Sequence, residues 1–67
     1  MTLGELLERI SNFKIKIMRK DGDGQHTLIY RGESRFFRPT DKEYNLWVHH
    51  IATDKHNSKG IFVLCED

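Results

Sequence analysis

The chain has 67 residues and a net charge of +1 at pH 7, from 11 lysines and arginines against 10 acids. A domain of this size buries only about 60% of its unfolded surface, which excludes a two-lobed enzyme with a large cleft. No apolar run approaches the roughly 18 residues of a membrane span. The N-terminus has no basic stretch followed by an apolar core, so we expect no signal peptide. Cys65 is the only cysteine, so no internal disulfide can form, and we expect a cytoplasmic protein.

The first residues predict a short amphipathic helix over residues 3–11. Its apolar side chains recur at the spacing i, i+3, i+4 and i+7, which places them on one helix face. Thr2 suits the N-cap position, and Glu5 stands three residues later, where its side chain completes a capping box. The apolar face of this helix consists of Leu3, Leu6, Leu7 and Ile10.

The next segment predicts a β-hairpin. Apolar and charged side chains alternate over residues 13–19, as in a strand with one buried face. Two Asp-Gly pairs at residues 21–24 are a strong hairpin-turn signal, and residues 26–31 form the returning strand. The expected buried face of the hairpin carries Phe13, Ile15, Ile17, Leu28 and Tyr30.

The second half of the chain leaves one alternative open. Thr40 and Glu43 have the spacing of another capping box, so a helix begins near Asp41. Residues 44–53 fit either a continuation of this helix or a strand, and we favour the strand because they contain few strong helix formers. Residues 61–65 form a continuous apolar run, which predicts an interior strand buried on both faces.

Together these elements predict an α+β fold in which the N-terminal helix packs on a three- to four-stranded antiparallel sheet. The expected order is α-β-β-short α-β-β, and a long helix over residues 41–52 would change it to α-β-β-α-β. The sequence contains no repeat and no linker, so we expect a single small domain over residues 1–67. The expected core also includes Val63, with Trp47 as a further candidate.

The charges are distributed unevenly along the chain. Residues 14–38 contain seven lysines and arginines against three acids, whereas the flanking segments are acidic. This segment is either a solvated face or a surface for an anionic partner, which could be a nucleic acid, a nucleotide or an acidic protein surface. Aromatic residues between arginines, as in residues 35–38, can stack on bases while the guanidinium groups hold phosphates. The expected partner-binding residues are Lys14, Lys16, Arg19, Lys20, Arg31, Arg35, Phe36 and Arg38.

The second face of the sheet predicts self-association. One helix of about nine residues covers only one sheet face, and soluble monomers rarely expose a large apolar patch. Alternation places four apolar residues on the other face, and a homodimer would bury them. The alternative is that residues 33–45, with Phe36 and Phe37, fold over this face. The expected interface residues are Met18, Ile29, Phe62 and Leu64.

The sequence predicts no catalytic, metal or cofactor site. His49 and His50 are adjacent, so on a strand they point to opposite faces and cannot share one metal ion. The Asp-Gly pairs resemble a calcium loop, but the required acids are missing at its first and last positions, so we expect a hairpin turn. Cys65 lies in an apolar run, where an inert structural thiol is expected.

The order of segments resembles a group of small uncharacterised proteins that are common in phages and mobile elements of Gram-positive bacteria. These proteins typically begin Met-x-x-x-Glu-Leu-Leu, as Met1–Leu7 does, and carry Tyr-x-Gly after the first hairpin, as Tyr30–Gly32 does. They end in an apolar strand. The resemblance also favours a strand over residues 46–53 in place of a longer helix. The resemblance covers nearly the whole chain and implies a phage-encoded protein that works by occupying a surface of a host protein.

Three functions follow from these expectations. The first is a non-enzymatic binding protein that blocks a host protein, such as an anti-CRISPR or other anti-defence inhibitor of a nucleic-acid-handling immune effector in the host cytoplasm. The second is direct binding of nucleic acid or nucleotide through the basic hairpin. The third is a structural role in a homo-oligomer. Binding to phosphates weakens steeply with salt, which separates the second function from the first. We expect no membrane partner.

Overall fold

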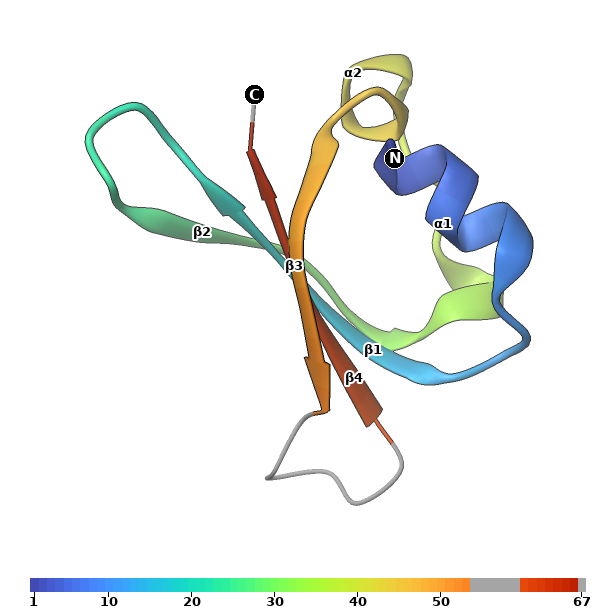
Figure 1. Cartoon of the computed structure of the whole chain (residues 1–67). Helices are drawn as coiled ribbons and strands as arrows, with labels where there is room; N and C mark the ends of the chain where they lie inside the picture. Colours follow the sequence, from blue (N-terminus) through green and yellow to red (C-terminus); the bar gives the residue numbers. More distant parts are fainter. Residues whose placement is uncertain (54–59, 67) are drawn as a thin grey trace.

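The computed structural model describes residues 1–53 and 60–66, which form one helical layer on one four-stranded sheet (Figure 1). The α+β fold and the expected order of elements are confirmed, and residues 47–53 form a strand. In chain order the elements are α1 (Leu3–Arg9), β1 (Lys14–Lys20), β2 (His26–Glu33), the 3-10 turn η1 (Ser34–Phe36), α2 (Asp41–Tyr44), β3 (Trp47–Thr53) and β4 (Gly60–Glu66).

The sheet is mixed, with the strand order β2-β1-β4-β3. The two outer pairs, β1–β2 and β3–β4, are antiparallel as expected, but the central strands β1 and β4 are parallel. After β2 the chain crosses the helical side of the sheet through η1 and α2 and enters the sheet again at the opposite edge as β3. Strand β4 therefore returns beside β1 in the same direction, because a crossover rather than a hairpin joins the two halves.

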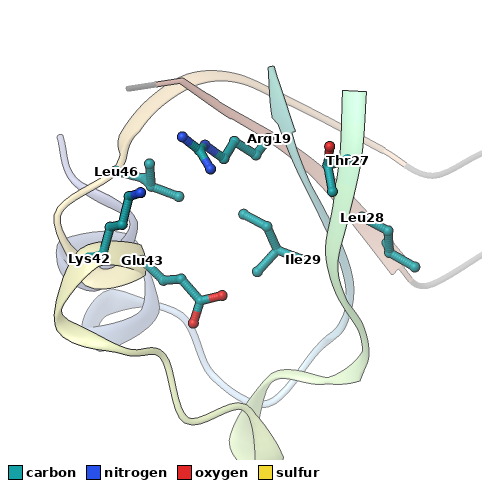
Figure 2. A pocket seen from close by; sticks show the side chains of 7 residues that line it. All are labelled: Arg19, Thr27, Leu28, Ile29, Lys42, Glu43 and Leu46. Carbon is teal, nitrogen blue, oxygen red and sulfur yellow. The ribbon is translucent and has the colours of Figure 1, made fainter. Parts of the chain in front are cut away.

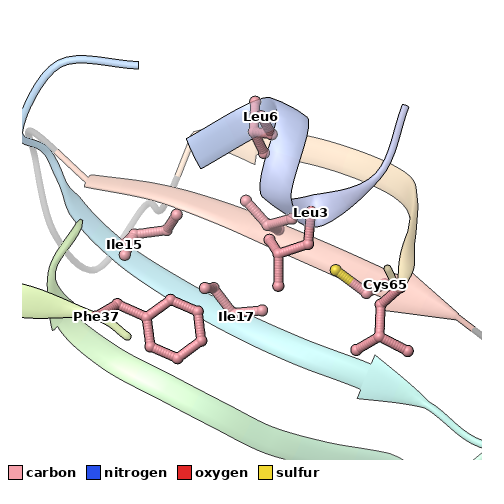
Figure 3. Close-up of a cluster of buried hydrophobic side chains, with 8 residues drawn as sticks. Leu3, Leu6, Ile15, Ile17, Phe37 and Cys65 are labelled. Atoms are coloured by element: carbon pink, nitrogen blue, oxygen red, sulfur yellow. The ribbon is translucent and has the colours of Figure 1, made fainter. Parts of the chain in front are cut away.

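The core lies between the helical layer and one face of the sheet (Figure 3). Leu3 and Leu6 of α1 lie over the centre of the sheet, where Ile17 and Val63 are fully buried. Burial of each such side chain contributes about 1.5–3 kcal/mol. At one side the ring of Phe37 stacks on that of Tyr30, with 4.7 Å between centroids. The buried core consists of Leu3, Leu6, Ile15, Ile17, Phe37, Leu46, Val63 and Cys65.

Hydrogen bonds at the N-terminus connect α1 to strand β3. The Glu5 N–H donates to Thr2 Oγ1 over 3.2 Å, and the Thr2 N–H donates to Glu5 Oε1 over 3.1 Å, which completes the expected capping box. The Leu3 N–H donates to the Leu46 carbonyl, and the Val48 N–H donates to the Met1 carbonyl. The helix is shorter than expected, because the chain is extended from Ile10 onwards.

Two β-bulges explain where the expected core was wrong. Ile29 is an extra residue in β2, so Tyr30 pairs with Ile17 on the core face, whereas Leu28 pairs with Met18 on the opposite face and is 51% exposed. A second bulge at His49 leaves Trp47 in register with Glu66, with 53% of its surface exposed. Phe13 precedes β1 and is 44% exposed, whereas Phe37, Leu46 and Cys65 are buried and complete the core.

Gly4 allows the two helices to touch. A Cβ at this position would meet the ring of Tyr44 far inside van der Waals contact. The Tyr44 hydroxyl donates to Glu8 Oε1 over 2.7 Å, and this hydrogen bond raises the pKa of the Tyr44 phenol. The ring is therefore held against α1, and only a residue without a side chain fits beneath it.

We predict that Gly4→Ala lowers the free energy of unfolding by about 1–3 kcal/mol, because overpacking outweighs the gain in helix propensity. Urea unfolding monitored by circular dichroism measures this change. Gly22→Ala is the control, because a Cβ at Gly22 has no atom within 4 Å, and we expect a change within about 0.5 kcal/mol. Equal stability of the two variants would contradict the close contact at Gly4.

We predict that Cys65 reacts with iodoacetamide only when the domain opens. The side chain is fully buried, and burial raises the pKa of its thiol to about 11, so little of the reactive thiolate exists at pH 8. We expect alkylation at pH 8 to be on the order of a hundredfold slower in buffer than in urea, as followed by mass spectrometry. Labelling of the native protein at the rate of an unfolded peptide would contradict the burial of β4.

Candidate functional site: the open face of the sheet

The face of the sheet opposite the helices is the candidate functional site, and we call it the open face. Figure 1 shows α1 and α2 on the same side of the sheet. Segment 33–45 also belongs to that side, because Phe37 and Leu46 enter the core there. In residues 1–53 and 60–66, no helix or turn therefore covers the open face.

Strand register places the open-face residues in four rows across the sheet, in the order β2, β1, β4, β3. The two inner rows hold most of the apolar residues, and the outer rows are mostly charged or polar, with Trp47 as the large aromatic exception. The inner rows are Arg31–Lys16–Phe62–Ala52 and Leu28–Met18–Leu64–His50. The outer rows are Glu33–Lys14–Gly60 and His26–Lys20–Glu66–Trp47. The open face thus combines an apolar group on β1 and β4 with cations on β1 and β2.

Positive charge predominates on the open face. Its cations are Lys14, Lys16, Lys20 and Arg31. Its two acids already have partners: Glu33 accepts a hydrogen bond from Asn12 Nδ2 over 3.0 Å and lies 3.8 Å from Arg35, and Glu66 lies 3.4 Å from His49 Nδ1. At the surface such pairs are weak, so they leave the excess of positive charge in place.

The structure brings together only half of the expected partner-binding residues. Lys14, Lys16, Lys20 and Arg31 share the open face, but Arg19 is in register with Thr27 and Cys65 on the helical side. The remaining three lie in or just after η1, beyond the end of the sheet. There the Arg35 guanidinium lies 4.7 Å from the centroid of the Phe36 ring, and Arg38 Nη1 donates to the carbonyls of Arg35 and Phe37.

The expected oligomer interface is partly corrected. Met18, Phe62 and Leu64 lie on the open face and are half-buried, but the bulge turns Ile29 towards the core. The expected alternative, in which residues 33–45 fold over this face, is wrong, because Phe37 packs on the helical side and Phe36 is 61% exposed. Self-association through this face stays a prediction.

Sequence reasoning missed two residues of the open face, Trp47 and His50. Both lie on β3, three residues apart, and the bulge at His49 turns them to the same face. The regular alternation of a strand would place them on opposite faces, so the sequence pattern does not bring them together. A tryptophan and paired histidines in a strand otherwise poor in charge were a weak signal that this strand has an exposed polar face.

A small hollow on the helical side is a second candidate (Figure 2). It has a volume of about 220 Å³ and lies between β2 and α2, with Ile29 and Leu46 as its apolar wall. Arg19, Lys42 and Glu43 border it with charges of both signs. Its volume suits a few water molecules, which makes it a weaker candidate than the open face.

Within residues 1–53 and 60–66, the side chains that resemble calcium or metal ligands do not form a metal site. Asp21 Oδ1 accepts hydrogen bonds from the N–H groups of Asp23 and Gln25, and Gly24 has φ +82°, so this segment is a hairpin turn as expected. Among the described residues, no three His, Cys, Asp or Glu side chains gather as a metal site would require. Within the same part of the chain, no helix has the length and apolar character to cross a membrane.

Comparison of the chain with family models, with curated proteins and with solved structures finds no match. The chemistry of the open face is therefore the basis for a functional proposal.

We predict that Trp47, the only tryptophan, reports on the open face. Because its side chain is half exposed at the border of this face, we expect the native protein to show strong quenching of tryptophan emission by acrylamide. Trp47→Phe should change the free energy of unfolding by less than about 1 kcal/mol, because exposed sites tolerate substitution. Emission protected from acrylamide would show that Trp47 is covered in solution.

Proposed function

We propose that this protein is a non-enzymatic binding protein that docks an anionic macromolecule on its open face. The observation that carries the proposal is the group of four cations on β1 and β2, Lys14, Lys16, Lys20 and Arg31, beside an apolar group that the described chain leaves uncovered. Apolar contact supplies binding energy, and surrounding cations select and attract a partner of opposite charge.

The charge of this face argues against a second copy of the chain as the first choice of partner. Face-to-face packing of two copies would bring two groups of four cations together, and the two acids of each face, Glu33 and Glu66, would offset only half of that charge. Like charges across an interface cost binding energy. An anionic partner turns the same charges into attraction.

An inhibitor of a host protein is one form of this function. The resemblance to small phage and mobile-element proteins supports it, because such compact domains act by occupying surfaces. In that case an acidic surface of a host protein would fill the open face, and binding would need no catalytic group.

Charge reversal on the open face tests the proposed function. The variant is Lys14→Glu with Lys16→Glu, and the matched control is Arg9→Glu with Lys42→Glu, which makes the same change in net charge on the helical side. The probes are heparin, poly-L-glutamate and a single-stranded dT15 oligonucleotide at low salt. We predict that the wild-type protein and the control bind at least one probe, and that the open-face variant binds it about tenfold or more weakly.

Circular dichroism and the protection of Cys65 check that both variants are folded, because Arg9, Lys14 and Lys42 are exposed but Lys16 is half-buried. Equal loss of binding in the two variants would mean that net charge alone matters. Equal binding by both, or no binding of any probe by the wild-type protein, would remove the open face as the binding site.

A further inference from the structure

We infer that the anionic partner is a single-stranded nucleic acid, with a base stacked on Phe62. This inference rests on the proposed function, because it names the partner of the same face. The central observation is that an aromatic side chain borders the line of cations, in one row with Lys16 and Arg31.

The strand that carries Phe62 gives the ring a firm support. Strand β4 is bonded to β1 on one side and to β3 on the other, so its backbone is held along its whole length. Neighbouring strands lie about 4.8 Å apart, which puts Lys16 on one side of Phe62 and the small side chain of Ala52 on the other. Phe62 is half-buried, so part of the residue remains accessible.

Cations and aromatic residues follow separate lines on the open face. Lys14, Lys16 and Lys20 all lie on β1, with Arg31 beside them on β2, whereas the aromatic residues lie on β4 and β3. Trp47 is in register with Glu66, which lies four residues beyond Phe62 along β4. At the rise of a strand this separation is about 13 Å. A single strand lying along the sheet would place phosphates over the cations and unpaired bases over the two aromatic residues.

Other anionic partners use these side chains less well. A carboxylate is repelled by the negative face of an aromatic ring, so an acidic peptide gains little from Phe62 and Trp47. In a duplex the bases are already stacked on one another and cannot reach a side chain on an open sheet. Unpaired bases, in contrast, present flat faces that stack on aromatic rings without regard to sequence.

Four probes test the inference by fluorescence anisotropy with the full chain: dT15, an abasic 15-mer, a dT15·dA15 duplex and poly-L-glutamate. We expect dT15 to bind about tenfold more tightly than each of the others, since stacking adds to phosphate binding. We also expect dT15 to quench the emission of Trp47 and the abasic strand to leave it unchanged.

Substitutions of the ring separate stacking from burial. Phe62→Leu keeps an apolar side chain and removes the flat ring, so we expect it to weaken dT15 binding about tenfold while affinity for the abasic strand stays the same. Phe62→Tyr should bind dT15 like the wild-type protein. Phe36→Leu is the matched control, because Phe36 is an exposed aromatic residue outside the open face, and it should have no effect.

The outcomes distinguish the inference from the proposed function. Equal affinity for dT15 and the abasic strand, poly-L-glutamate or the duplex, or equal affinity of Phe62→Leu and Phe62→Tyr for dT15, would overturn base stacking. If Lys14→Glu with Lys16→Glu still abolished binding in that case, the open face would stand as a site for another anionic partner. If this double variant bound dT15 like the wild-type protein, both proposals would fall.

Discussion

The parallel pairing of β1 and β4 is the interaction on which the rest of the structure depends. It places Ile17 beside Val63 at the centre of the sheet, and both side chains are fully buried. Tyr30 and Ile51 extend this row to the two outer strands. Because β1 and β4 come from opposite ends of the chain, this one contact joins the N-terminal hairpin to the C-terminal strands. Leu3 and Leu6 of α1 pack on the buried residues of this central pair.

In residues 1–53 and 60–66, helices and turns cover one face of the sheet and leave the other open, and the short chain explains this arrangement. Sixty-seven residues form a four-stranded sheet and one layer of short helices, and the helices are needed over the row of Ile17 and Val63. The opposite face must then be compatible with water. Lysines in alternate positions of β1 meet this need, and the same lysines, together with the half-buried Met18 and Phe62, create a surface suited to a charged partner.

The sheet edges are also adapted to exposure. Each outer strand carries one bulge, at Ile29 in β2 and at His49 in β3, and bulges make an edge a poor template for pairing with another chain. The bond from the Val48 N–H to the Met1 carbonyl covers the start of the β3 edge. Both edges of the sheet are therefore poor sites for the addition of a strand from another chain.

Local sequence patterns by themselves determined the helix, the hairpin, the capping boxes at Thr2 and Thr40, and the interior position of β4. These features depend on side chains a few residues apart, whose spacing is visible in the chain. The expected core at Leu3, Leu6, Ile15, Ile17 and Val63 was correct for the same reason. Four of the expected partner-binding residues share the open face because strand alternation alone sets their direction.

Only the tertiary structure decided the parallel central pair and the faces of the outer strands. A bulge inserts one residue without any sequence signal here, and it reverses every side chain beyond it, which moved Leu28 and Trp47 out of the core and Ile29 into contact with it. The burial of Phe37 depends on the turn at η1, which brings its ring onto that of Tyr30, seven residues earlier in the chain. The open face exists as a surface because strands from both ends of the chain lie side by side, a contact that no local pattern encodes.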